Sequence, residues 1–179
     1  AKGSGTIRAI WPVSSADVWA GTGDFRLRLT DAAGTTLAEV PFSPIGGADG
    51  DFAVLVPRPD GLASISLVGP AGETLATRHA SANAPTVRVT TPNGGQTLTR
   101  ASHRVAWEAS DADGDARSAV VQFSPDAGLT WTTVAMEVSG NAVDVDFADL
   151  PGTTQGLIRV MVSDGFLASS DVSDATFTV

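Results

Sequence analysis

Short stretches in which apolar and polar residues alternate are the feature that most constrains the fold of this chain. In FRLRLT, at 25–30, every second residue is apolar and the residues between are Arg or Thr. Because successive side chains of a strand point to opposite faces, this pattern predicts a strand with one buried face. Such stretches recur at intervals of about 8 to 12 residues, separated by Gly, Pro, Asp and Asn, with no long helical periodicity. We therefore expect an all-β protein.

The alternating stretches fall into two groups along the chain. The first group predicts strands at 6–10, 25–30, 36–42, 51–56, 63–68 and 73–78. The second group predicts strands at 86–92, 103–110, 118–124, 129–137, 142–147, 157–163 and 175–179. The second group has the number of short strands that is typical of an immunoglobulin-type sandwich.

The length of the chain and one short segment predict where it divides. A chain of 179 residues is long for one small sandwich and suits two domains of about 90 residues each. The segment HASANAPT, at 79–86, is small and polar and contains Pro85, after which a new alternating stretch begins. We therefore expect two tandem β-sandwich domains, at 1–84 and 85–179, joined by a linker of limited reach.

Apolar residues on one face of three strands in the second domain are expected to form its core, with contributions from both sheets. Trp107 is among them, so we expect it to be a core residue rather than a platform for a ligand. The predicted core residues are Val105, Trp107, Val143, Val145, Phe147, Ile158, Val160 and Val162.

Composition and charge exclude several classes of partner. With 11 basic against 20 acidic residues and a net charge of −9, the chain is not expected to bind nucleic acid, whose phosphates it would repel. No apolar run approaches the roughly 20 residues of a membrane helix, so we expect a chain that is not transmembrane. The first residues lack the apolar core of a signal peptide, which indicates a mature chain or a fragment. Because there is no cysteine, redox compartment cannot be inferred.

The residue types that catalysis needs are sparse and isolated. The two histidines, His79 and His103, stand outside any metal-ligand spacing, and no Gly-x-Ser-x-Gly motif is present. Asp144 and Asp146 alternate in VDVDF, so both are expected on the solvent-facing side of a strand rather than in a glycosidase cleft. We expect no enzymatic activity.

Three stretches of the second half carry a family resemblance: VAWEASDADGD, VVQFSPDAGLTW and DLPGTTQGLIRVMVSDG. Through them, residues 85–179 resemble the fibronectin type III and immunoglobulin-like modules of secreted bacterial proteins. LPGT followed by an alternating strand is similar to the E-F corner of fibronectin type III domains, although Leu157 or Ile158 stands in the place of the corner tyrosine. The resemblance implies immunoglobulin/fibronectin III-like sandwiches and an extracellular or cell-surface location.

A hairpin motif lies inside this region and fits the pattern S-x-D-x-G-x-T-W. The pattern resembles the Asp-box known from sialidases and many other β proteins, where it braces a hairpin. The residue types suit that role, because Asp can accept backbone N–H bonds, Gly can take a positive φ and Trp can cover the turn. A sialidase would require several boxes, an arginine cluster and a tyrosine nucleophile, so the resemblance implies a brace alone. The matching residues are Ser124, Asp126, Gly128, Thr130 and Trp131.

The stretch SDADGD, at 110–115, lies between two strands predicted in the second domain. In a sandwich, the loop that contains Asp164, Asp171 and Asp174 reaches the same pole. Converging carboxylates repel one another, and Ca²⁺ relieves the repulsion by taking about 6 to 8 oxygen ligands. The predicted calcium ligands are Asp111, Asp113, Asp115 and Asp164.

Two alternatives to calcium stand beside this prediction. One is a hydrated turn rich in Asp and Gly, and the other is a counter-charge from Arg78 or another basic group of the first domain. The stretch is not an EF-hand, because Gly114 falls at its fourth position and Gln122 at the twelfth, where a bidentate Glu is needed.

These observations predict a non-catalytic tandem of β-sandwiches in a secreted or cell-surface bacterial protein, acting as a binding, spacer or supporting module. The expected partner is a protein or a glycan, and the expected state is a monomer within a larger chain. One alternative is a carbohydrate-binding module, since four Trp residues could stack on sugars. Another is an accessory C-terminal region of a secreted peptidase or glycosidase.

Overall fold

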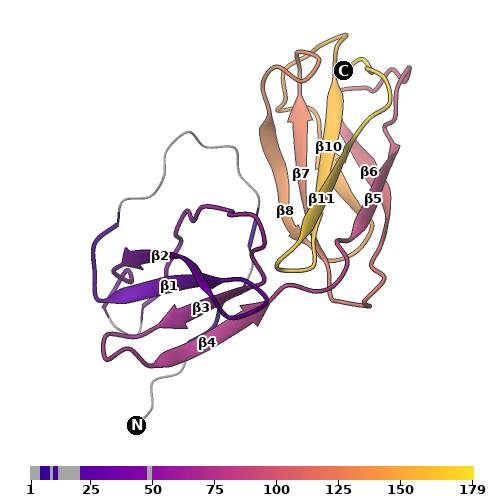
Figure 1. Cartoon of the computed structure of the whole chain (residues 1–179). Helices are drawn as coiled ribbons and strands as arrows, with labels where there is room; N and C mark the ends of the chain where they lie inside the picture. The colour runs from indigo at the N-terminus through magenta and orange to yellow at the C-terminus, as the bar shows by residue number, and fades with distance from the viewer. Residues whose placement is uncertain (1–4, 9, 12–20, 48–49) are drawn as a thin grey trace. The chain divides into compact units, whose positions relative to one another are not determined.

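The computed structural model describes residues 5–8, 10–11, 21–47 and 50–179. These residues form eleven strands in three antiparallel sheets and contain no helix (Figure 1), which confirms the all-β prediction. Among them, therefore, no helix is long and apolar enough to cross a membrane. The chain divides into two compact units, Ala1–Ala80 and Ser81–Val179.

The first unit contains one four-stranded antiparallel sheet with the order β2-β1-β3-β4. The alternation in FRLRLT has the expected effect, since Leu27 and Leu29 are buried while Arg26 is exposed. Other residues of the sheet complete this core, among them Phe42 and Ile65. The strands are β1 (Phe25–Thr30), β2 (Thr36–Phe42), β3 (Ser64–Val68) and β4 (Thr74–His79).

Two stretches of the first unit that predicted strands do not form them. The described part of 6–10 has no strand, and 51–56 makes only an isolated bridge between Ile45 and Asp51. Exposure nevertheless alternates along 51–56, and Phe52 packs on Phe42 with ring centroids 4.8 Å apart. The alternating pattern therefore identified an extended segment with one inward face, but not whether another backbone pairs with it.

The second unit contains a three-stranded sheet, β5-β6-β9, and a four-stranded sheet, β11-β10-β7-β8. The pairings are antiparallel throughout these two sheets. The strands are β5 (Thr86–Thr91), β6 (Ser102–Ser110), β7 (Ser118–Ser124), β8 (Thr132–Val138), β9 (Ala142–Asp146), β10 (Leu157–Ser163) and β11 (Ala168–Val172).

One continuous apolar core joins the two sheets of the second unit. It includes the predicted core residues, with Trp107 only 3% exposed, while Val143 is partly buried and packs against the cluster. Phe123, Phe147 and Phe177 meet in its centre with ring centroids 5.7 to 6.2 Å apart. Packing from both sheets onto one cluster is the arrangement of a β-sandwich.

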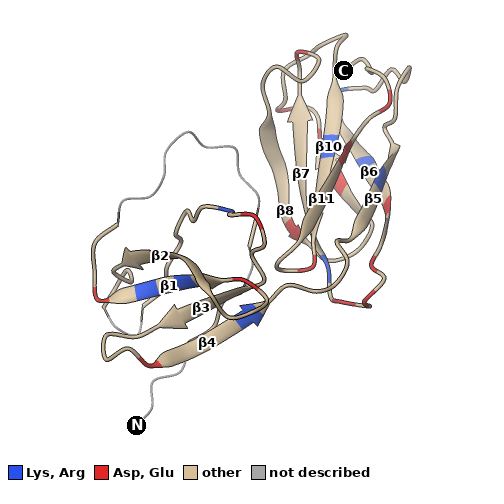
Figure 2. Ribbon diagram, in the orientation of Figure 1, with Lys and Arg blue, Asp and Glu red and all other residues tan. Residues whose placement is uncertain are grey.

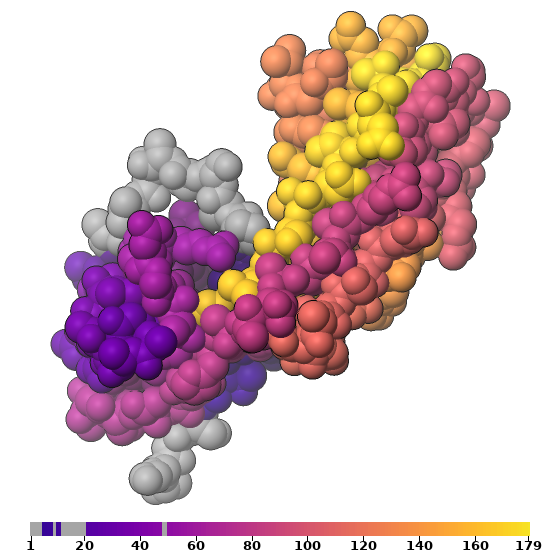
Figure 3. All heavy atoms as spheres, turned by 45° about the vertical axis from the view of Figure 1, so that its right-hand side comes forward, coloured from indigo at the N-terminus to yellow at the C-terminus, as the bar shows by residue number. Residues whose placement is uncertain are grey.

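The last part of the chain differs from the prediction. The predicted strand at 175–179 pairs only through isolated bridges, from Phe177 to Gly156 and from Thr178 to Thr97. A strand instead forms earlier, as β11, within the stretch predicted to be a loop. Figure 3 shows this C-terminal segment, in yellow, lying beside the magenta residues that follow β5.

The second unit has two opposite ends, which we call its poles. At the N-terminal pole, β5 begins at Thr86 opposite Ser110, the last residue of β6. At the C-terminal pole, β6 begins at Ser102 opposite Asp146, the last residue of β9. The poles are therefore separated by the length of β6.

The first and last segments of the second unit lie at different poles (Figure 1). Asn83 is held at the N-terminal pole by Asp113, in the loop that follows β6. Val179 is held at the C-terminal pole, where its N–H donates to the carbonyl of Thr153 at 2.8 Å. The chain thus enters this unit at one end of the sandwich and reaches Val179 at the other.

Candidate functional site

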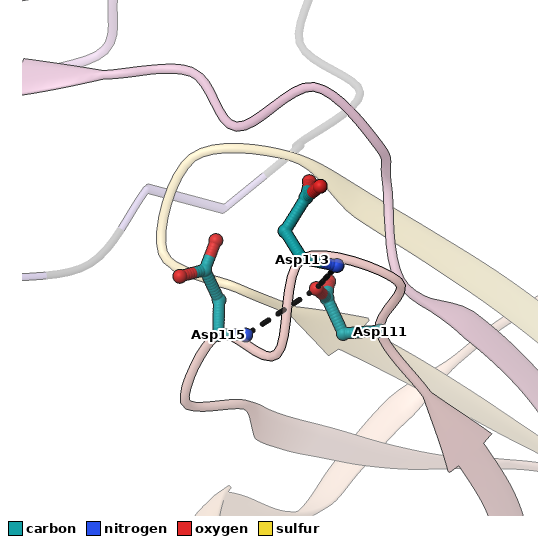
Figure 4. A group of neighbouring side chains, drawn as sticks. All are labelled: Asp111, Asp113 and Asp115. Carbon is teal, nitrogen blue, oxygen red and sulfur yellow. Dashed lines mark hydrogen bonds between the residues drawn. The ribbon is translucent and has the colours of Figure 1, made fainter.

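The acidic loop at 111–115 directly follows β6 (Figure 2) and is drawn in Figure 4. The Oδ1 of Asp111 accepts hydrogen bonds from the backbone N–H groups of Asp113, at 2.9 Å, and Asp115, at 3.3 Å. Gly114 has a φ of 77°, a conformation that glycine adopts readily. The loop therefore turns around the carboxylate of Asp111, which brings one oxygen from each aspartate within 4.8 Å of the others.

Asp113 is bound by a residue 30 positions earlier in the chain. Asn83 donates from its backbone N–H to Oδ2 at 2.7 Å and from Nδ2 to Oδ1 at 2.8 Å. The backbone hydrogen bond first, and then the side-chain hydrogen bond, favour the charged carboxylate and lower the pKa of Asp113 below its ordinary value of 3.8. Amide donors thus stabilise a negative charge of this loop.

The acidic loop offers few oxygens that are free for a cation. The Oδ2 of Asp111 is buried and has no hydrogen-bond partner in the part of the chain that the structure describes, and the carboxylate of Asp115 is exposed. Both oxygens of Asp113 already accept hydrogen bonds from Asn83. Because Ca²⁺ takes about 6 to 8 oxygen ligands, backbone or water oxygens would have to complete the shell. Calcium and a hydrated turn both stay predictions: Asn83 braces Asp113, and the Oδ2 of Asp111 is left without a partner among the described residues.

Asp164 lies at the N-terminal pole but within a turn of its own. Its Oδ1 accepts hydrogen bonds from the N–H groups of Phe166 and Leu167, both at 2.7 Å, and its Oδ2 accepts one from the hydroxyl of Ser81 at 2.7 Å. The side chain is only 7% exposed. Among the described residues, the group of close carboxylates comprises Asp111, Asp113 and Asp115 and does not include it.

Of the three residues considered as neighbours of the acidic loop, Asp164, Asp171 or Asp174, the last two bind other partners. Asp171 accepts a hydrogen bond from the N–H of Val89 at 2.7 Å, and Asp174 accepts one from Nδ2 of Asn93 at 2.6 Å. The physical reason is that β11 begins at Ala168, so the chain already runs away from the N-terminal pole at these positions.

Arg78, the predicted alternative source of counter-charge, lies in the first unit. Its guanidinium donates hydrogen bonds to the carbonyl oxygens of Ile7, at 3.2 Å, and Arg8, at 2.8 Å. These contacts connect β4 with the segment at 5–8. They explain the place of Arg78 within the first unit.

The turn between β7 and β8 is built by the residues of the predicted hairpin brace. The hydroxyl of Ser124, whose side chain is fully buried, accepts hydrogen bonds from the N–H groups of Gly128, at 2.8 Å, and Asp126, at 3.3 Å. It donates to Oδ1 of Asp126 at 2.8 Å. Ala127 and Gly128 have φ of 56° and 92°, so two consecutive residues reverse the chain around this hydroxyl.

Asp126 closes the same turn from its other side. It accepts hydrogen bonds from the N–H of Thr130 at 2.8 Å and from the hydroxyl of Thr130 at 2.5 Å. The hydroxyl first, and then the N–H, favour the charged carboxylate and lower the pKa of Asp126 below its ordinary value of 3.8. The predicted role of Asp126 as an acceptor of backbone hydrogen bonds is confirmed.

Trp131 covers the turn and is itself covered. Its indole N–H donates to the carbonyl of Gly128 at 3.0 Å. The guanidinium of Arg159 lies 4.3 Å from the centroid of the Trp131 ring and makes a cation–π contact. The Nε of Arg159 donates a hydrogen bond to Oε1 of Gln122 at 2.8 Å. Trp131, which is partly buried, therefore contacts both its own hairpin and β10.

His103, Asp144 and Asp146, which were considered for catalysis, lie on or beside strands of the second unit. Nε2 of His103 lies 2.9 Å from the carbonyl of Thr99, and its ring meets Phe147 edge-on. Asp144 and Asp146 are exposed on β9, as predicted, and Asp146 accepts a hydrogen bond from the N–H of Ala148. These contacts give His103 and Asp146 roles at the ends of strands.

Several residues that fix the loops were not identified from the sequence. Asn83 and Ser81 bind aspartates 30 and 83 positions away. Ser173, only 6% exposed, donates to the carbonyl of Pro92 and accepts from the N–H of Ile158. The small polar composition of 79–86 signalled a linker, and nothing in it signalled partners so distant in sequence.

Comparisons of the chain with protein families, with curated proteins and with solved structures find no match.

Proposed function

We propose that this chain is a non-catalytic β-sandwich spacer of a secreted or cell-surface bacterial protein. The observation that carries the proposal is that the first and last segments of the second unit lie at opposite poles, with Asn83 bound at one and Val179 at the other. A module with this geometry separates whatever adjoins its two ends by its full length. A module whose ends share one pole adds little separation.

The fixed loops of the second unit support the same role. Asp113, Asp126 and Asp164 each accept at least two hydrogen bonds that hold the backbone of a turn or a neighbouring segment. A carboxylate used in this way is a structural element rather than a free acid or base. The loops at which sandwiches commonly carry binding residues are here stiffened by their own aspartates.

The family proposed for the second unit is the fibronectin type III or immunoglobulin-like class. Its sheets of three and four strands, β5-β6-β9 and β11-β10-β7-β8, have the composition of a seven-stranded sandwich. We propose the hairpin from Ser124 to Trp131 as an Asp-box, supported by its hydrogen bonds. In this assignment the box is a brace and has no catalytic part.

The rival proposal, a carbohydrate-binding module with an aromatic platform, has less support. Trp107 is 3% exposed, and the ring of Trp131 is covered by Arg159. Stacking on a sugar needs an open aromatic face. Trp19 lies outside the described residues. Trp107 therefore offers no open face, and Arg159 occupies a position over the ring of Trp131.

A replacement experiment tests the spacer proposal. In the surface protein that carries this chain, residues 81–179 are exchanged for an unrelated β-sandwich whose ends also lie at opposite poles, and in a matched variant for a sandwich whose ends share one pole. A spacer predicts that the first exchange preserves the activity of the attached parts and that the second impairs it. Loss of activity in both exchanges would indicate a specific binding role and overturn the proposal.

A further inference from the structure

Residues 93–98 and 174–178 form a joint between the segment that follows β5 and the last part of the chain (Figure 3). Both segments lie outside the strands, so individual contacts rather than a sheet ladder hold this joint closed. Backbone hydrogen bonds of 2.8 to 2.9 Å cross the joint at three places: from Gly95 to Thr176, from Leu98 to Thr178 and from Thr178 to Gln96.

The side chain of Asn93 connects the two sides of the joint. Its Nδ2 donates to Oδ2 of Asp174 at 2.6 Å, and its Oδ1 accepts the backbone N–H of Asp174 at 2.8 Å. The partner of Nδ2 is a carboxylate, which only accepts hydrogen bonds, so this position needs a donor. An amide satisfies both partners, and a carboxylate in its place would face another carboxylate.

The fold requires glycine directly after Asn93. Gly94 has a φ of 123°, and a Cβ at this position would lie 2.6 Å from the Cβ of Ala175, so a side chain would be both strained and obstructed. The joint therefore places Asn before Gly, the pair in which the backbone nitrogen meets the least steric hindrance when it attacks the side-chain amide. The other asparagines of the chain, Asn83 and Asn141, are each followed by Ala.

We propose that Asn93 is a site of spontaneous deamidation and that the reaction opens the joint irreversibly. The backbone nitrogen of Gly94 attacks Cγ of Asn93, the side-chain nitrogen leaves as ammonia with the proton of the attacking nitrogen, and a five-membered imide forms. Water then opens the ring to aspartate or isoaspartate, so that in sum an amide and water give an acid and ammonia. The new negative charge faces Asp174, and the like charges repel each other.

In the closed joint, both reacting groups are held by hydrogen bonds. The N–H of Gly94 donates to Oε1 of Gln96 at 2.8 Å, and the amide of Asn93 is bound to Asp174. Attack requires that both groups are released, so the reaction proceeds during local opening of the joint. The rate of deamidation therefore depends on how often the joint opens, and the product favours the open state.

Peptide mass spectrometry of the full chain during prolonged incubation at mildly alkaline pH measures the reaction. We expect conversion at Asn93 and none at Asn83 or Asn141. Gln96→Ala should speed the conversion roughly two- to tenfold, because it removes one hydrogen bond that holds the attacking N–H. Gln155→Ala, at an exposed side chain outside the joint, is the matched control. Conversion at Asn93 no faster than at the other asparagines, or equal rates in the two glutamine variants, would overturn the proposal.

Hydrogen exchange followed by nuclear magnetic resonance tests the consequence for the joint. Asn93→Asp reproduces one product of the reaction and should speed exchange of the N–H groups of Gly95 and Thr178 about tenfold, whereas Asn141→Asp, which adds the same charge at an exposed position outside the joint, should not. Adding Asp174→Asn to Asn93→Asp should restore slow exchange, since it supplies an amide donor opposite the new carboxylate. Unchanged exchange in Asn93→Asp, or faster exchange that Asp174→Asn does not reverse, would contradict the proposed opening.

Discussion

At the scale of single residues, short polar side chains in the second unit hold together backbone segments that no sheet ladder joins. The hydroxyl of Ser173 links β10 to the segment after β5, and Asp171 accepts the N–H of Val89 across the edge between β11 and β5. Ser124 does the same inside a single turn. Since buried backbone N–H groups must find acceptors, these side chains supply them where the sheets end.

Replacing Ser124 by alanine tests the hairpin brace. The substitution removes the acceptor of the Gly128 N–H and leaves this partly buried donor without a partner. We expect the free energy of unfolding of the second unit to fall by about 1 to 3 kcal/mol, measured by urea denaturation followed by Trp fluorescence. Ser139→Ala, at an exposed serine after β8, is the control. Equal curves for both variants would show that the hydroxyl does not hold the turn.

The pKa of Asp126 predicts a dependence of stability on pH. The pKa of Asp126 in the folded protein is lowered from 3.8, chiefly by the hydroxyl of Thr130. The charged carboxylate therefore contributes fully to the free energy of unfolding above the unfolded pKa of about 3.9. This contribution is lost as the pH falls through the folded pKa. We expect Asp126→Asn to reduce the loss of thermal stability below about pH 4, relative to the unmodified chain and to Asp149→Asn. Thermal melts at fixed ionic strength measure this, and an unchanged acid dependence in Asp126→Asn would count against it.

At the scale of elements, the sequence predicts ten of the eleven strands among the described residues and misses one edge strand, β11. Strands β6 and β10 alternate because one face of each meets the core, whereas β7 is buried on both faces. Strand β11 has the sequence ASSDV and lies at a sheet edge, so it needs little apolar character and was predicted as loop. The alternating pattern indicates which side chains of a segment are buried. Whether the segment pairs with another strand depends on the backbone beside it, about which the pattern carries no information.

In the candidate sites, contacts between residues close in sequence could be predicted, and contacts between distant residues could not. The hairpin from Ser124 to Trp131 was predictable because the hydrogen bonds among its own motif residues lie within a few positions. The acidic loop was predictable as a group of three carboxylates, but Asn83 as the partner of Asp113 was not. The unpaired indole N–H of Trp107 was also beyond prediction, since it depends on what the packed core leaves without an acceptor.

The acidic loop yields a prediction about calcium. Since Asn83 satisfies both oxygens of Asp113, we expect the same melting temperature with calcium and with chelator at fixed ionic strength. Asp113→Ala should lower the melting temperature equally in both conditions, because it removes the acceptor for Asn83 and no ion. A calcium-dependent rise that disappears in Asp113→Ala would instead identify a calcium site, since an ion that binds only the folded state stabilises it.

At the scale of the whole molecule, the second unit spans the distance between its two poles. Asn83 and Ser81 fix the first segment to the N-terminal pole through Asp113 and Asp164. Hydrogen bonds between Val179 and Thr153 in both directions fix the last residue to the C-terminal pole. With both ends bound to the sandwich, the separation between them is set by the strands rather than by flexible segments.

The distance between the two poles is the measurement that tests this account most directly. The chain has no cysteine, so spin labels can be placed selectively on Ala84→Cys and Asp149→Cys, both exposed, and their separation measured by double electron–electron resonance. A strand of nine residues such as β6 spans roughly 30 Å at about 3.3 Å per residue. We predict one narrow distribution near that length, unchanged by calcium. A distribution centred at about half that length, or a broad one, would contradict a spacer with its ends at opposite poles.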